Sequence, residues 1–238
     1  MRATSWGGLF QTPPGSQDTG KTLNFPDETM DSIAFYFDFV SPYAYLASNE
    51  IEVLAERHGK KLQWLPFRLG VVVVKVMGLK PLLDTPLKGP YARHDASRMA
   101  KVLGLPLTDD FSMFDPVPAH QLMYTQPLEK RPALAKALLS ARWGEGRNLG
   151  DRDILFDVAQ KAVGIDKQCF RETIESKESR SAVNEATQAA VSRGVFGSPT
   201  FAAGNELFWG GDRIWLLDQY LAAGARYVPA TVTPLTPD

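Results

Sequence analysis

The sequence is poor in cysteine, in net charge and in long apolar runs, and each shortage excludes a class of protein. Cys169 is the single cysteine among 238 residues, so no disulfide can form within the chain. A formal net charge of −1 lacks the basic excess typical of nucleic-acid-binding proteins. No apolar run approaches the roughly 20 residues that a membrane-spanning helix needs. We therefore expect no nucleic-acid partner and no membrane span, and the scarcity of cysteine favours a reducing compartment, the cytoplasm.

The two ends of the chain differ in composition from the middle. Residues 1–31 are rich in Gly, Pro, Thr, Ser and Gln, and the first 20 have no apolar segment typical of a secretion signal. The last residues carry three prolines. We predict a loosely packed arm over 1–31 and a similar tail over 227–238.

The first part of the central region reads as strand, helix, strand. Residues 35–40 are aromatic or β-branched apart from Asp38, and 61–67 has a similar character. A helix begins between them, with Ser41 as N-cap and Pro42 at the first helical position. Because no hairpin turn joins the two strands, we expect a right-handed crossover between parallel neighbours.

Helical periodicity then dominates until strand signals return late in the chain. The predicted helices lie at 91–103, 132–143, 151–163, 166–175 and 179–193, with a loop at 108–118. Two short strands at 199–203 and 206–209 and a final helix at 212–223 close the chain. We predict an α/β protein in which residues 32–70 and 194–226 form one mixed-sheet domain and residues 71–193 form a helical insertion.

Ser41 is the first candidate functional residue. It places a hydroxyl at the positive end of a helix and just past the carboxyl end of a strand, where α/β proteins bind ligands. A serine before proline is more often only an N-cap, and that interpretation stays open for Ser41 taken alone.

Three further stretches are candidates for the same site. Ser198 and Pro199 open a strand, and a cis peptide there would leave the Ser198 main chain free for an extended ligand; an ordinary turn is the commoner outcome. Trp209-Gly210-Gly211-Asp212 is a glycine turn in which Asp212 either caps the last helix or binds a ligand ammonium group. The turn at 143–148 is a weaker candidate for a pocket wall.

Taken together, residues 35–47, 195–200 and 209–213 resemble the 2-hydroxychromene-2-carboxylate isomerases and the related kappa-class glutathione transferases. Both belong to the DsbA-type branch of the thioredoxin-like superfamily. The resemblance covers roughly residues 33–224. It implies a thioredoxin-like β-α-β and β-β-α domain with a large all-helical insertion.

The resemblance also implies roles for individual residues. Ser41 matches the family serine whose hydroxyl donates to the sulfur of bound glutathione, and Ala44 stands where dithiol relatives keep a second cysteine. Ser198, before Pro199, matches the residue whose main chain holds the cysteinyl part of glutathione. Trp209, Gly210, Gly211 and Asp212 match the turn that holds the γ-glutamyl end.

The activity implied is a glutathione-dependent cis–trans isomerisation of an aromatic or conjugated 2-oxo acid through reversible thiolate addition. The partners implied are glutathione, a small electrophilic substrate and a second copy of the chain. On the substrate side the sequence departs from the family, because Val73 lies near the place of a family lysine, although Tyr91, Asp95 and Arg98 keep the helix pattern. Two alternatives stay open: a kappa-like transferase or peroxidase, and a non-catalytic thioredoxin-like binding module.

The remaining ionisable residues suggest little chemistry. His58, His94 and His120 show no metal-ligand spacing, and a surface position is expected for the last two. Cys169 is expected to be a small, partly buried residue of a short helix. Asp38 lies within an apolar run and would need a hydrogen-bonding partner if it were buried.

Overall fold

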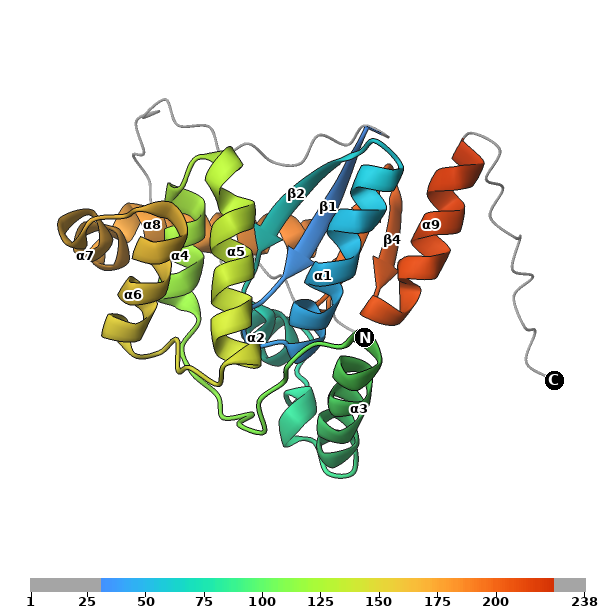
Figure 1. The fold of residues 1–238 in the computed structure, drawn as a ribbon, viewed down its shortest axis with the longest axis horizontal. Helices are drawn as coiled ribbons and strands as arrows, with labels where there is room; N and C mark the ends of the chain where they lie inside the picture. The colour runs from blue at the N-terminus through green and yellow to red at the C-terminus, as the bar shows by residue number, and fades with distance from the viewer. Residues whose placement is uncertain (1–30, 225–238) are drawn as a thin grey trace, which may run out of the picture.

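The computed structural model describes residues 31–224, so the predicted arm and tail lie almost wholly outside the described residues. Its centre is a four-stranded sheet in the order β2-β1-β3-β4 (Figure 1). The strands are β1 (Ser32–Phe37), β2 (Lys61–Pro66), β3 (Thr200–Ala203) and β4 (Glu206–Trp209). β1 pairs with β2 in parallel, whereas β3 is antiparallel to both β1 and β4.

Successive side chains of β1 point to opposite faces of the sheet, and both faces are covered. Ile33, Phe35 and Phe37 point into the larger of two apolar clusters, and Ala34 and Tyr36 point into the smaller one. All are buried, which is why the strand reads as an unbroken apolar run. The helix α1 (Pro42–Arg57) and the last helix α9 (Ile214–Ala223) cover the first face, and α8 (Lys177–Ser192) covers the second.

The segment between β2 and β3 consists of helices and loops and contains no strand, as the periodicity predicts (Figure 1). Its helices are α2 (Leu69–Val71), α3 (Lys88–Leu103), α4 (Val117–Thr125), α5 (Arg131–Leu139), α6 (Arg152–Val163), α7 (Lys167–Glu175) and α8. Single π-helical turns follow α2 at Val72–Val76 and α5 at Ser140–Gly144, and 3₁₀ turns lie at Leu82–Asp84, Leu128–Lys130 and Gly211–Arg213. The element order β-α-β, helical segment, β-β-α is therefore confirmed.

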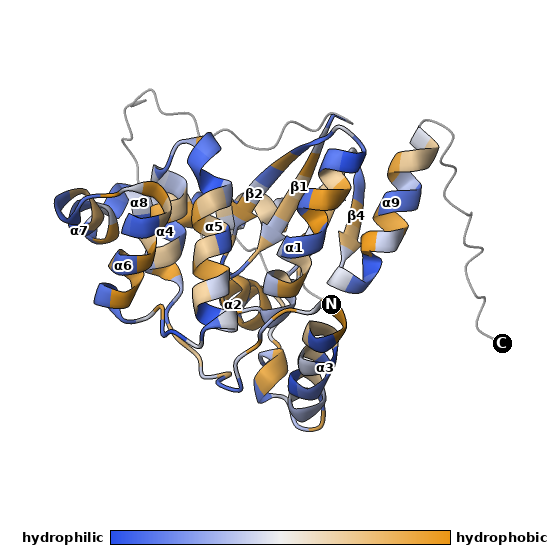
Figure 2. Cartoon of the chain, viewed as in Figure 1, coloured by the Kyte–Doolittle hydropathy of each residue, from blue (hydrophilic) through white to orange (hydrophobic). Residues whose placement is uncertain are grey.

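The sheet and the helical segment share one core. The larger cluster joins Phe35 and Phe37 of β1 to Leu122 of α4, Leu138 of α5 and Trp143. Figure 2 shows that α1, α6 and α9 each carry both apolar and polar residues, as expected for amphipathic helices that cover a core. No helix within residues 31–224 is both long and apolar enough to cross a membrane.

Several predicted bounds and one predicted loop differ from the structure. β1 begins at Ser32 and not at residue 35, and α3 begins at Lys88 and not at residue 91. β1 ends at Phe37, so Asp38 lies just after the strand. The helix α4 replaces the end of the predicted loop, because Pro116 and Pro118 stand at its N-cap and first turn, where proline is tolerated. The last helix begins at Ile214, two residues later than predicted.

Candidate functional site

Ser41 joins the start of α1 to the start of β3. Its side-chain oxygen accepts a hydrogen bond from the Ala44 N–H at 3.2 Å, which makes it the N-cap. The same hydroxyl donates to the main-chain carbonyl of Ser198 at 3.0 Å. The capping interpretation and the ligand-site interpretation are therefore compatible, because one hydroxyl both caps the helix and points across to the segment before Pro199.

The segment before β3 runs alongside Ser41. The Ser198–Pro199 peptide is cis. The Ser198 hydroxyl accepts a hydrogen bond from the Asp38 N–H at 2.9 Å, while the Ser198 N–H donates to no atom of residues 31–224. The Gly210 N–H donates to the Pro199 carbonyl at 2.9 Å, which brings the glycine turn to the same place.

The turn at 209–212 depends on the lack of a side chain at Gly210, and the Trp209 ring depends on the lack of one at Gly197. Gly210 has φ of +102°, a conformation that residues with a side chain rarely adopt. A Cβ atom on Gly197 would collide with the indole ring of Trp209, which packs edge-on against Phe196 with ring centroids 4.8 Å apart. The Trp209 side chain is 56% exposed, so the turn presents an aromatic surface beside Ser198.

Asp212 does not cap the last helix, contrary to one of the two roles considered for it. It lies within the 3₁₀ turn Gly211–Arg213, and α9 begins after it. Its carboxylate is 66% exposed and pairs with Arg213 at 2.6 Å. An exposed pair of this kind contributes little to stability, so the carboxylate is available to a cationic ligand group.

Asp38 is a residue of the site that sequence reasoning left without a partner. Its side chain is 1% exposed and accepts hydrogen bonds from the N–H groups of Val40 and Leu69 at 3.2 and 2.8 Å. The Nε2 atom of His120 lies 3.2 Å from the Asp38 Oδ1 atom. His120 is fully buried, so its predicted surface position was wrong, whereas the exposure predicted for His94 is confirmed.

Trp143 packs against the loop between β1 and α1 and does not form a pocket wall. Its side chain is 1% exposed, and its Nε1–H donates to the Phe39 carbonyl at 2.8 Å. The buried guanidinium of Arg142 lies over the indole ring, 4.6 Å from its centroid. Both contacts fix the loop between β1 and α1 from the helical side.

The helix α3 contacts the first turn of α1 through Tyr43. The Tyr43 hydroxyl donates to the Ala92 carbonyl and to the Asp95 carboxylate, both at 3.1 Å, and Asp95 pairs with Arg98 at 2.6 Å. Burial, followed by the charge of Asp95, raises the pKa of Tyr43 well above its ordinary value. The phenol is therefore neutral at physiological pH and serves as a donor.

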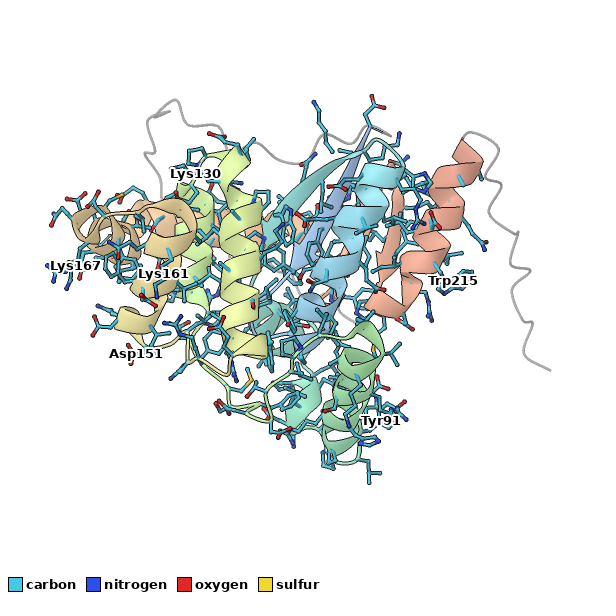
Figure 3. All side chains as sticks on the ribbon, in the orientation of Figure 1. Tyr91, Lys130, Asp151, Lys161, Lys167 and Trp215 are labelled. Carbon is cyan, nitrogen blue, oxygen red and sulfur yellow. The ribbon has the colours of Figure 1, made fainter. Side chains whose placement is uncertain are left out.

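Two aromatic residues labelled in Figure 3 extend into solvent, one from α3 and one from α9. Tyr91 on α3 is 62% exposed, and Trp215 on α9 is 58% exposed. Cys169 on α7 is also exposed, contrary to the partial burial predicted for it. Since Cys169 is the chain's single cysteine, no thiol of the protein lies at positions 41–44.

The arrangement as a whole favours an anion that accepts hydrogen bonds. The positive end of α1 and the Ser41 hydroxyl lie together, and beside them the N–H of Ser198 has no acceptor within the described residues. Among residues 31–224 no group of three or more His, Cys, Asp or Glu side chains is placed to hold a metal ion.

Comparisons with known proteins agree with this architecture. The family model described as a DSBA-like thioredoxin domain matches residues 32–222. A 2-hydroxychromene-2-carboxylate isomerase of Pseudomonas putida is 29% identical over 195 residues, which are 82% of this chain and 96% of that protein. Glutathione S-transferase kappa 1 of Caenorhabditis elegans is 26% identical and covers 79% of this chain and 90% of its own length. The solved structure of a 2-hydroxychromene-2-carboxylate isomerase superposes with a TM-score of 0.71 at 28% identity, over 80% of this chain and 94% of that one.

Proposed function

Because this chain belongs to the family of DsbA-like thioredoxin domains, we propose that it is an enzyme that uses glutathione to isomerise a conjugated or aromatic 2-oxo acid. One observation carries the proposal: a serine hydroxyl lies at the N-terminus of α1 and donates to the carbonyl of the residue before Pro199. A redox role is not proposed, since neither position 41 nor position 44 is a cysteine. The likeness to proteins named isomerase and to a kappa transferase supports the same class of chemistry.

The donors and acceptors around Ser41 fit an extended thiol peptide. The Ser198 N–H is open, and the Ser41 hydroxyl can turn from the Ser198 carbonyl towards a ligand sulfur. That rotation would free the Ser198 carbonyl to accept an amide N–H of the ligand. Trp209-Gly210-Gly211-Asp212 would hold the γ-glutamyl end, with the exposed Asp212 carboxylate facing its ammonium group.

Glutathione, when bound, supplies a thiolate that adds reversibly to a conjugated acceptor and is released unchanged after rotation. The residues of this chain make the thiolate accessible near neutral pH. The Ser41 hydroxyl donates to the sulfur, and the positive end of α1 favours negative charge at the same point. A thiol in such a place has a pKa below the roughly 8.5 of a free thiol.

The substrate side of the site is proposed to lie towards α3. Tyr43 connects α1 to this helix through Asp95, and the guanidinium of Arg98 is half exposed there. A planar guanidinium suits the carboxylate of a 2-oxo acid. Val73, near the place of the family lysine, offers no charge, so the substrate is expected to differ from those of the isomerases that carry that lysine.

The test combines binding with a glutathione balance. Titration calorimetry with reduced glutathione is expected to show saturable binding to the wild-type protein. A panel of conjugated 2-oxo acids, followed by absorbance with glutathione assayed in parallel, is expected to yield an isomer while the glutathione concentration stays constant. Absence of binding would overturn the proposal, and binding without turnover across the panel would favour a non-catalytic binding module.

A kappa-like transferase is the second candidate, favoured by the likeness to the kappa transferase of Caenorhabditis elegans. It would use the same Ser41 donor, because both reactions need a thiolate. The two functions differ in one measurable quantity. A transferase consumes one glutathione for each molecule of product, so a falling glutathione concentration in the same assay would select it.

A further inference from the structure

Asp38 lies directly behind both serines of the site. Its main-chain N–H donates to the Ser198 hydroxyl at 2.9 Å, and its carbonyl accepts the Ser41 N–H at 3.0 Å. The two serines come from segments 157 residues apart in the chain, and Asp38 contacts both. Any movement of the main chain at Asp38 therefore moves the Ser41 hydroxyl relative to Ser198.

The Asp38 side chain anchors that main chain to three parts of the molecule. Its carboxylate accepts from Val40 in its own loop and from Leu69 just after β2, and it lies 3.2 Å from the Nε2 atom of His120 on α4. The carboxylate is 1% exposed, and the His120 ring is 0% exposed. A buried carboxylate needs its partners, because loss of one leaves buried polar atoms without a hydrogen-bonding or polar neighbour.

His120 is itself held firmly on α4. The neighbouring Gln121 donates to Ser179 on α8 at 2.6 Å, and Tyr124, one turn later, donates to the Pro66 carbonyl at 2.5 Å. The imidazole ring also packs against Phe39, with centroids 5.4 Å apart. Among residues 31–224 neither ring nitrogen has a partner in hydrogen-bond geometry, and the polar group that the ring approaches is the Asp38 carboxylate, 3.2 Å from Nε2. The 3.2 Å contact between Nε2 and Oδ1 therefore joins two buried polar side chains.

We propose that Asp38 and His120 form a positioning pair that sets the Ser41 hydroxyl for its ligand. His120 fixes the Asp38 carboxylate through the 3.2 Å contact of Nε2 with Oδ1, and Asp38 fixes the loop that carries Ser41 and contacts Ser198. The helical insertion thus determines the geometry of a site on the sheet domain. This inference rests on the proposed function for the ligand, glutathione, and neither residue is assigned contact with it.

The test uses two substitutions of His120. His120→Gln keeps a side-chain N–H donor of similar reach without an imidazole, whereas His120→Leu removes the donor. Reduced glutathione is bound to the wild type and to each variant, and the pH of each complex is varied. The ultraviolet absorbance of the thiolate measures the thiolate fraction at each pH. We expect His120→Leu to lower the thiolate fraction at neutral pH by about tenfold, since displacement of a positioned group by about 1 Å has effects of this size or larger. His120→Gln is expected to stay close to wild type.

A second measurement does not depend on glutathione. Amide hydrogen exchange of Val40, Ser41 and Leu69 is compared in the ligand-free wild type and variants, alongside denaturant unfolding. His120→Leu should speed exchange at these amides more than its change in global stability explains. Asp38→Asn should do the same, and the double variant should add little, because the two residues act as one unit.

The outcomes separate this inference from the proposed function. If wild type does not bind glutathione, the proposed function fails, and amide exchange alone decides the positioning role. If glutathione binds and both His120 variants match wild type in thiolate fraction and exchange, the positioning pair is wrong. Equal losses in His120→Gln and His120→Leu would also overturn it, because they would show that a polar group facing Asp38 is not what His120 supplies. If His120→Leu does not fold, the thiolate fraction and amide exchange of His120→Gln and Asp38→Asn test the same positioning role.

Discussion

At the scale of single residues, the site depends on hydrogen bonds made by small polar groups. The Ser41 hydroxyl donates one hydrogen bond and accepts another, and the Ser198 hydroxyl accepts one from the Asp38 N–H. Such bonds carry modest net energy but fix direction closely, so changes at these residues should alter ligand chemistry more than stability.

Replacement of Ser41 by alanine tests the thiolate proposal. We expect Ser41→Ala to raise the pKa of the bound glutathione thiol towards that of a free thiol and to lower turnover about a hundredfold, while stability falls by about 1 kcal/mol through loss of the cap. Ser176→Ala is the matched control, because Ser176 caps α8 by accepting from the Ser179 N–H at 3.1 Å. It should show the stability loss alone. Equal thiol pKa values in the two variants would contradict the role of Ser41.

Gly197 offers a second test at the residue scale. Gly197→Ala places a methyl group against the Trp209 indole and should displace the turn at 209–212. Because that turn is proposed to hold the γ-glutamyl end, we expect glutathione affinity to fall about tenfold, measured by calorimetry. Gly70→Ala is the control, since its added Cβ would meet no atom within 4 Å. Unchanged affinity in Gly197→Ala would remove the turn from the proposed site.

At the scale of elements, α4 connects the helical segment to both the sheet and the site. Tyr124 donates to Pro66 at the end of β2, and His120 reaches Asp38 after β1. The sequence pattern did not predict α4, because prolines at its start look like breaks. The helix nevertheless lies where the two parallel strands end, so it is well placed to support ligand-binding loops.

The stability of this junction is expected to fall at alkaline pH, because Tyr124 is neutral in the folded protein. Burial raises the pKa of Tyr124, outweighing the opposite effect of Arg131. A raised pKa in the folded state means that this contribution is complete below the unfolded value of about 10 and is lost as pH rises above it. We expect the free energy of unfolding to fall above about pH 10.

The matched comparison is Tyr124→Phe against Tyr91→Phe. Tyr124→Phe should cost about 1 kcal/mol at neutral pH, and its deficit relative to wild type should narrow above about pH 10. Tyr91 is 62% exposed, so Tyr91→Phe should change the free energy of unfolding by less than about 0.5 kcal/mol. Denaturant unfolding at a series of pH values measures both, and a deficit that is constant with pH would contradict the assignment.

At the scale of the whole molecule, the shared apolar cluster joins the sheet and the helical segment. Phe35, Leu122 and Leu138 belong to one cluster although they come from different parts of the chain. The division into a thioredoxin-like domain and an insertion stays a prediction, as do the homodimer and the cytoplasmic location. A shared core does predict that the described region unfolds as one cooperative unit.

Leu138→Ala tests this cooperativity. Leu138 is fully buried, so its truncation should cost about 2–5 kcal/mol. Circular dichroism and tryptophan fluorescence should report the same shifted midpoint, because sheet and insertion lose the cluster together. Leu128→Ala, at a site 53% exposed, should leave the midpoint nearly unchanged. Two separate transitions in Leu138→Ala would show that the parts unfold independently.

The sequence by itself determined the β-α-β, helical segment, β-β-α order, the serine at the start of α1 and the absence of a dithiol. These follow from local rules: periodicity sets strand or helix, Ser-Pro marks a helix start, and residue identity excludes a thiol. The proximity of Ser41, Ser198 and Gly210 was anticipated through the family resemblance, and their hydrogen bonds place them together.

Only the tertiary structure decided what lies behind these residues. It buried His120 against Asp38, placed Trp143 beneath the Phe39 carbonyl and left Cys169 exposed. Each outcome depends on contacts between segments far apart in the chain, which periodicity does not encode. A histidine on an unpredicted helix carries no local sign of the carboxylate it will meet, because the partner is chosen by how the helices pack and not by spacing along the sequence.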